Sequence, residues 1–251
     1  MTTISYFSLL LGLLLLAVPG YAIFVCDRLT WRKTAVAVVR MLVQTTAMGA
    51  CLWALYRFDT LWLNLLWLLL LVMATAFLLV SRARVSSGVL WLPACVAMFA
   101  SVLLVSAYVL LLVFRPEAPW SARWFVPVTG VLMAHVLTTN IPAVRTYYDS
   151  LRQDRQPYLT MLGNGATRRQ ALAPYLARAL KSLTVPAVAN LSATGLFVMP
   201  MLLSGLLLGG QSPAEAVVAF VFLMLASLAV SVLSLFLMLW LADLREHGGQ
   251  K

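Results

Sequence analysis

Long apolar runs dominate this sequence and decide the class of fold that the chain can adopt. A helix needs about 20 mostly apolar residues to cross a hydrocarbon layer of about 30 Å. Runs of this length exceed the roughly ten residues of a membrane β-strand, so each is expected to be an α-helix. Seven segments qualify: 6–25, 34–56, 61–80, most of 89–114, 125–144, 182–208 and 216–241. We therefore expect an all-α polytopic membrane protein whose residues 1–251 form a single transmembrane domain.

The charged residues exclude a soluble domain and predict an orientation. Only 10% of the residues are charged, against about 25% in soluble domains. The formal net charge is +10, which fits cytoplasmic loops that meet anionic lipid headgroups, and no charge-rich domain is present to bind nucleic acid. With the N-terminus outside, the outer segments hold only Arg57, Arg115 and Arg123, and the other basic residues between spans lie inside. The positive-inside rule then places the N-terminus out and the C-terminus in.

One predicted cytoplasmic segment, residues 145–181, is much longer than the roughly 2–8 residues of an ordinary helix connection. Thr167 followed by Gln170 has the form of a capping box, which predicts a helix beginning at Arg168. Pro174 suits the first turn of a further helix, so we expect a short helix over 168–173 and a second helix that leads into span six.

Two glycines, Gly163 and Gly165, precede this short helix and allow a sharp turn. Arg168 and Arg169 place positive charge at the positive end of the helix dipole, so an acidic or polar partner surface is expected to face them. By residue type alone, a hairpin lying on the inner leaflet with its arginines at lipid phosphates remains an equal alternative.

The sequence contains several short motifs of polar residues, glycines and prolines at defined positions along the chain. Span two holds Arg40, Gln44 and Gly49, and the cytoplasmic segment reads Gly165-Ala166-Thr167-x-x-Gln170-Ala171. The later positions are Pro186, Gly195, Pro200, Ser204-Gly205, Ser212-Pro213 and Ala216. In these motifs, and in length and order of spans over nearly the whole chain, the sequence resembles the FetB-like permeases of ABC transporters. That bacterial metal-export family has plant aluminium-tolerance proteins among its relatives.

The resemblance implies a permease subunit in a bacterial inner membrane that pairs with itself and with separate ATP-binding subunits. The chain has no Gly-x-x-x-x-Gly-Lys-Ser/Thr phosphate loop, so ATP and Mg²⁺ are expected in the partner ATPase, with no cofactor and no enzyme activity in this chain. The short helix would be the coupling helix. The residues expected to couple to the ATPase are Gly165, Ala166, Thr167, Arg168, Arg169 and Gln170.

The sequence also departs from the family at positions that bear on the substrate. Ala189 and Ser192 stand where the family has Asp and Lys, Ala134-His135 replaces Gly-Asn, and Phe220 replaces Gln. The family's Pro-Gly-Met-Met becomes Pro200-Met201-Leu202-Leu203. An iron-like metal is the first expectation for the exported substrate, and a hydrophobic or amphipathic compound is the alternative. A stand-alone secondary transporter or channel, and more remotely a membrane enzyme or assembly factor, are the other classes.

Polar and soft side chains inside the spans are the candidates for a substrate path. His135 is an intramembrane ionisable group, which marks a functional site by default, although a neutral imidazole bonded to a neighbouring helix is the plain alternative. Arg40 could instead anchor at headgroups, or form an ion pair or a dimer contact. Met199 and Met201 could bind soft metals with His135, or simply pack. The expected path residues are Arg40, Gln44, His135, Asn190, Ser192, Thr194, Met199 and Pro200.

Overall fold

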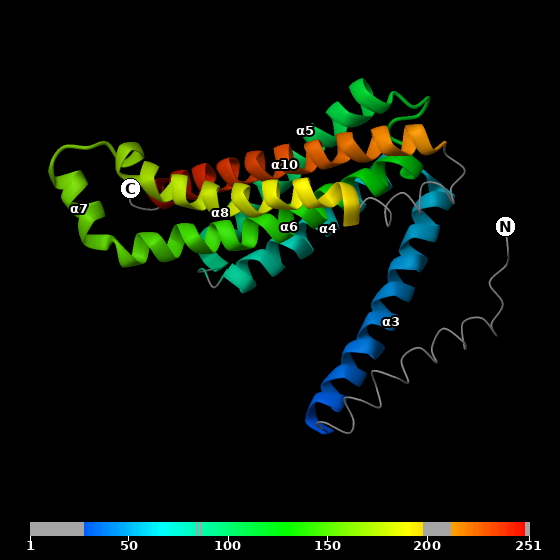
Figure 1. The fold of residues 1–251 in the computed structure, drawn as a ribbon, viewed down its shortest axis with the longest axis horizontal. Helices are drawn as coiled ribbons and strands as arrows, with labels where there is room; N and C mark the ends of the chain where they lie inside the picture. Colours follow the sequence, from blue (N-terminus) through cyan, green and yellow to red (C-terminus); the bar gives the residue numbers. More distant parts are fainter. Residues whose placement is uncertain (1–27, 84, 86, 198–211, 249–251) are drawn as a thin grey trace. The chain divides into compact units, whose positions relative to one another are not determined.

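The computed structural model describes residues 28–83, 85, 87–197 and 212–248, and every regular element in these ranges is helical. The elements, in chain order, are α3 (Arg28–Phe58), α4 (Leu61–Ala83), α5 (Ser87–Tyr108) continued by the π-helix η1 (Val109–Phe114), α6 (Ala122–Gln153), α7 (Arg155–Gly163), α8 (Arg168–Phe197) and α10 (Pro213–Gly248) (Figure 1). The all-α prediction is confirmed.

Five of the described helical segments are long and apolar enough to cross a membrane. They are Trp31–Phe58, Leu61–Ala83, Leu90–Phe114, Ala122–Gln153 and Pro213–Arg245. These match predicted spans two, three, four, five and seven, which confirms a multi-pass membrane protein. Predicted span one lies outside the described residues, and span six is described only as far as Phe197.

The chain divides into two compact units, Met1–Arg57 and Phe58–Lys251. The first unit contains nearly all of α3, whose Thr45 hydroxyl donates to the Met41 carbonyl at 2.9 Å. Such bonds within one helix satisfy polar groups that would otherwise face lipid alone. Near its C-terminal end, the Arg57 guanidinium lies over the Trp53 ring, 5.1 Å from the ring centroid.

The second unit is a helix bundle in which α10 packs against α5 and α6, and α6 also packs against α4 and α8. Leu68, Val72, Ala76 and Leu79 recur every three or four residues along α4, and all four are fully buried. This spacing places them on one helix face. In lipid, helices associate through close packing rather than exclusion from water, so such complementary faces hold the bundle together.

A set of polar contacts joins the start of α4 to the start of α6. The Asp59 carboxylate accepts a bond from the Ala122 amide nitrogen at 2.6 Å and one from the Ser121 hydroxyl at 2.7 Å. The Asn64 side-chain amide donates to the Trp120 carbonyl at 2.8 Å. Asp59 therefore caps α6 from a distant point in the sequence, and the Ala122 amide, followed by the Ser121 hydroxyl, lowers the pKa of this carboxyl.

The predicted break at Pro174 is wrong, because α8 runs without interruption from Arg168 to Phe197 with Pro174 and Pro186 inside it. The separate short helix is instead α7, which precedes the turn. One face of α8 explains its continuity: Ala171, Tyr175, Ala179 and Leu183 are all buried. Their spacing of four places them on one side of the helix, and their packing compensates for the hydrogen bond that each proline removes.

Candidate functional site: a cytoplasmic tip and an intramembrane cavity

The turn between α7 and α8 is built as the sequence predicts. Gly165 has φ +85°, in the left-handed region where a side chain is disfavoured. The Thr167 amide nitrogen donates to Gln170 Oε1 at 2.9 Å, and the Gln170 amide nitrogen donates to Thr167 Oγ1 at 3.4 Å. This reciprocal pair is a capping box, and it begins α8 at Arg168.

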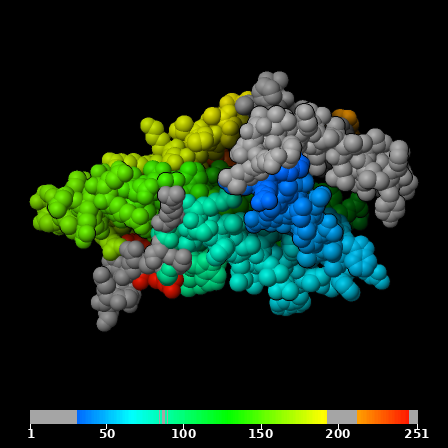
Figure 2. Space-filling model, turned by 90° about the horizontal axis from the view of Figure 1, so that it is seen from below, coloured from blue at the N-terminus to red at the C-terminus, as the bar shows by residue number. Residues whose placement is uncertain are grey.

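Side chains of α8 hold α7 and its preceding turn in place. Arg178 Nη1 lies 2.6 Å from Asp154 Oδ2, and the Tyr175 hydroxyl donates to the Asp154 carbonyl at 3.2 Å. The Tyr158 and Tyr175 rings meet edge to face with their centroids 6.4 Å apart. We call residues 154–173, from this turn through α7 to the first turns of α8, the tip. In Figures 1 and 2 it lies at one end of the second unit.

A further ion pair connects the tip to the last helix. Arg168 Nε lies 2.7 Å from Asp243 Oδ1, and the two side chains are 29% and 26% exposed. We expected an acidic or polar partner surface to face Arg168. For this residue the expectation is wrong, because Asp243 of α10, within the same chain, supplies the acid. Arg169, the next residue, is exposed.

The α7 helix presents an exposed surface of mixed character. None of its residues is buried, and Leu159 and Met161 are 47% and 41% exposed. Arg152, Arg155 and Arg169 are exposed around it, while the described acids Asp149 and Asp154 are already in ion pairs with Arg145 and Arg178. The tip therefore offers apolar contact and surplus positive charge, a combination suited to an acidic protein groove.

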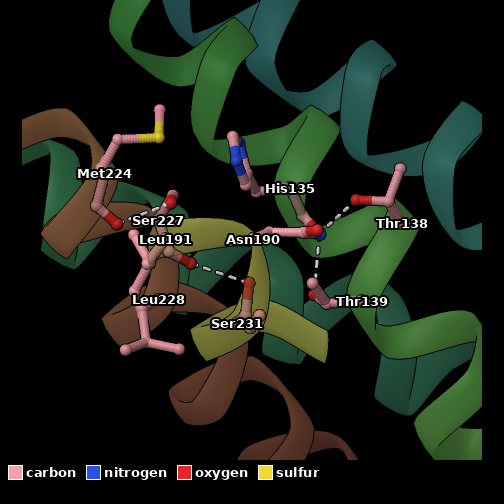
Figure 3. A pocket seen from close by; sticks show the side chains of 10 residues that line it. His135, Thr138, Thr139, Asn190, Leu191, Met224, Ser227, Leu228 and Ser231 are labelled. Carbon is pink, nitrogen blue, oxygen red and sulfur yellow. Dashed lines mark hydrogen bonds between the residues drawn. The ribbon is translucent and has the colours of Figure 1, made fainter. Parts of the chain in front are cut away.

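The helices α6, α8 and α10 line a partly open cavity of about 120 Å³ (Figure 3). At about 1.5 Å per helical residue, His135 lies about 20 Å from the start of α6, near the middle of its span. The lining residues are His135, Thr138, Thr139, Ala187, Asn190, Leu191, Met224, Ser227, Leu228 and Ser231. The cavity thus places one imidazole, four hydroxyls, an amide and a thioether at mid-membrane depth.

The polar groups of the cavity bond mostly to their own helices. His135 Nδ1 lies 3.2 Å from the Val131 carbonyl oxygen. The hydroxyls of Thr138 and Thr139 donate to the His135 carbonyl at 3.0 and 2.7 Å. The Ser227 hydroxyl donates to the Met224 carbonyl, and the Ser231 hydroxyl to the Ser227 carbonyl, both at 2.7 Å (Figure 3).

Next to the cavity, a buried polar pair joins α6 to α10. Asn140 is fully buried, and its side-chain nitrogen donates to Ser234 Oγ at 2.7 Å. Ser234 in turn donates to the Ser231 carbonyl at 3.0 Å. Our reading of the sequence missed Asn140 and the serines 227, 231 and 234. Their spacing of four and three along one face of an apolar helix is the signal that could have found them.

The structure brings together two of the predicted path residues, His135 and Asn190. Ser192 does not line the cavity, and its hydroxyl donates to the Ala189 carbonyl at 2.8 Å. Arg40 and Gln44 lie on α3 in the other unit. Met199, Pro200 and Met201 lie outside the described residues, as does the side chain of Thr194. Among the described residues, no group of three or more His, Cys, Asp and Glu side chains could hold a metal ion.

Fold and site together define a multi-pass, all-helical membrane protein with a polar cavity inside its bundle and a basic tip at one end. The chain belongs to the family described as "Uncharacterised protein family (UPF0014)", which it matches over residues 6–245.

Three relatives illustrate this membership. The UPF0014 membrane protein slr1647 of Synechocystis sp. is 27% identical over 201 residues, 78% of this chain and 75% of the relative. The UPF0014 membrane protein STAR2 of Oryza sativa is 33% identical over 51% of this chain and 46% of that protein. The Protein ALUMINUM SENSITIVE 3 of Arabidopsis thaliana is 30% identical over 43% and 39%. No solved structure matches the chain.

Proposed function

We propose that this chain is the transmembrane permease subunit of an ABC transporter, acting as a homodimer with separate ATP-binding subunits that hold ATP and Mg²⁺. The resemblance of its motifs to FetB-like permeases supports this assignment. The observation that carries it is the tip, where the exposed helix α7 connects two long helices, α6 and α8, that continue into the bundle.

The geometry suits the transmission of movement. The helices α6 and α8 have 32 and 30 residues, or about 48 and 45 Å at about 1.5 Å per residue. Displacement of the tip by a partner would therefore reach the depth of the cavity through unbroken helices. The sequence predicted that a helix over 168–173 contacts the ATPase. We now assign this contact to α7 and the first turn of α8, where Arg155 and Arg169 are exposed.

Export of an iron-like metal and efflux of an amphipathic compound are the two candidate activities. Hard cations prefer several anionic oxygen ligands. Among the described residues that line the cavity, none carries a carboxylate. This favours a soft metal or an organic cation over a hard metal ion such as Fe³⁺.

Co-purification tests the proposed function. The full chain, purified from its native membrane, should retain a subunit with an ATP-binding sequence motif and ATPase activity. The double change Arg155→Glu and Arg169→Glu should reduce the amount retained at least about tenfold, because reversing two interfacial charges places like charges opposite an acidic groove. Arg123→Glu, the same change at the predicted outer end, is the matched control. Normal ATPase retention by the double variant, or no ATPase with the wild type, would contradict the proposal.

A further inference from the structure

We propose that the cavity between α6, α8 and α10 is a binding site for a small monovalent cation, held by uncharged lone pairs. As a statement about transported cargo this rests on the proposed function, whereas as a binding site it stands on the cavity alone.

The hydroxyls that line the cavity have already committed their protons. The Ser227 and Ser231 hydroxyls donate to carbonyls of α10, and those of Thr138 and Thr139 donate to the His135 carbonyl of α6. A hydroxyl has one proton and two lone pairs. The oxygens can therefore accept bonds from a ligand without losing any bond that they make now.

The His135 imidazole, like the hydroxyls, bonds within its own helix and can offer a lone pair to a ligand. His135 Nδ1 lies within hydrogen-bond distance of the Val131 carbonyl oxygen, which can only accept. In the tautomer that donates from Nδ1 to this carbonyl, Nε2 keeps a lone pair. His135 and Met224 both line the cavity, and in Figure 3 the His135 ring and the Met224 thioether extend to the same side of the view, so the lining includes a nitrogen and a sulfur donor as well as hydroxyl oxygens.

The pair beside the cavity also has a surplus acceptor. Ser234 has given its proton to the Ser231 carbonyl, so its oxygen must accept from Asn140 and the amide nitrogen must face it. The amide oxygen of Asn140 then points elsewhere, and among the described residues it has no hydrogen-bond partner although Asn140 is fully buried. A buried carbonyl without a donor is costly, and it adds to a local excess of electron pairs.

A cavity with an excess of lone pairs and no fixed negative charge favours a cation that carries one positive charge. An anion would need free protons, and the four hydroxyls that line the cavity already use theirs, whereas a cation uses their free lone pairs. The free-energy cost of removing an ion from water rises steeply with its charge. Uncharged oxygen, nitrogen and sulfur ligands therefore offset this cost more fully for a monovalent cation than for a divalent one. A soft metal ion such as Ag⁺ and a small ammonium such as methylammonium share this chemistry, and the Met224 sulfur separates them, since thioethers prefer soft metals.

Binding is measured by titration calorimetry on the full chain in lipid nanodiscs, with methylammonium, Ag⁺, Fe²⁺ and acetate as probes. The Ag⁺ titrations use a background in which Cys26, Cys51 and Cys95 are changed to Ala. The cavity variant combines Ser227→Ala and Ser231→Ala. The matched control combines Ser101→Ala and Ser106→Ala, two buried serines of α5 that bond to their own helix and do not line the cavity.

At least one monovalent cation should bind at one site per chain, more tightly than Fe²⁺ or acetate. The cavity variant should weaken this binding about tenfold or more, because two acceptors of a charged ligand are lost, while the α5 control should bind as the wild type does. Met224→Leu should weaken Ag⁺ binding and spare methylammonium. Equal unfolding temperatures of the two serine variants verify that folding is intact.

Three results would overturn the proposal: no binding of either monovalent cation, tighter binding of Fe²⁺ or acetate, or unchanged binding in the cavity variant. The proposed function fails separately. If the monovalent cation binds as expected but the chain retains no ATPase, the site stands and the permease assignment falls. If the ATPase is retained and no probe binds, the reverse holds.

Discussion

Gly165 is the residue whose backbone most restricts what can replace it. Its φ of +85° disfavours any side chain, although a Cβ would meet nothing within 4 Å. We expect Gly165→Ala to lower the free energy of unfolding by about 1 kcal/mol, through backbone strain alone. Gly163→Ala, also without a Cβ contact but in the helical conformation of α7, is the control and should not destabilise. Thermal unfolding in detergent checks both, and equal effects would refute the turn geometry.

Asp59 predicts a dependence of stability on pH. Hydrogen bonds from the Ala122 amide and then the Ser121 hydroxyl hold the pKa of this carboxyl below its ordinary value of 3.8. A lowered folded-state pKa gives stabilisation that is present above 3.8 and lost as the pH falls through the folded value. Wild type should therefore unfold at a higher temperature than Asp59→Asn at neutral pH, and the difference should vanish below the folded pKa. A constant difference down to pH 2 would contradict the role of the charge.

Local patterns predicted these residue-level features to different degrees. The capping box of Thr167 and Gln170 is contained in four consecutive residues, so the sequence was sufficient to place it. The partner of Arg168 is Asp243, which is distant in sequence and meets it only because the start of α8 lies beside the last turns of α10. No local pattern carries such a pairing.

At the scale of elements, the ends of helices were harder to predict than their existence. The spans follow from hydropathy, but α8 continues through Pro174 because its buried face, with Ala171 and Tyr175 on either side of the proline, packs against the bundle. The tendency of proline to break a helix holds for an isolated helix. In α8, tertiary packing outweighs it.

The ion pair between α8 and α10 gives a prediction about these two elements. Asp243→Arg should destabilise by about 1 kcal/mol, because it places a like charge against a partly buried Arg168. Adding Arg168→Asp should recover most of the loss, since an acid suits the start of α8 and a base suits the last turns of α10. A double-mutant cycle of unfolding free energies measures the coupling, and purely additive effects would show that the two side chains do not interact.

At the scale of the whole molecule, hydropathy predicts how many times the described chain crosses, but not which helices are neighbours. The cavity depends on α6, α8 and α10 meeting, so His135 and Asn190 could be proposed from residue type while Ser227 and Ser231 could not. The serines look like ordinary small residues of an apolar helix until α10 is placed against α6.

The orientation of the molecule remains a prediction, and it has a direct test. With the N-terminus outside, a reporter fused after Arg155 should be active only as a cytoplasmic enzyme, and one fused after Pro116 only as an external enzyme. The strong inner bias of Lys and Arg is the physical reason. External activity of the Arg155 fusion would invert the topology and would move the tip away from any cytoplasmic ATPase.

Transport in proteoliposomes tests the central claim most directly. The chain is reconstituted with its co-purified ATPase, and cation movement is followed with and without ATP. We predict movement that requires both ATP and the ATPase and that is lost in the Arg155→Glu and Arg169→Glu double variant. Equal movement by the chain alone, driven by an ion gradient and indifferent to ATP, would show a secondary transporter and contradict the account.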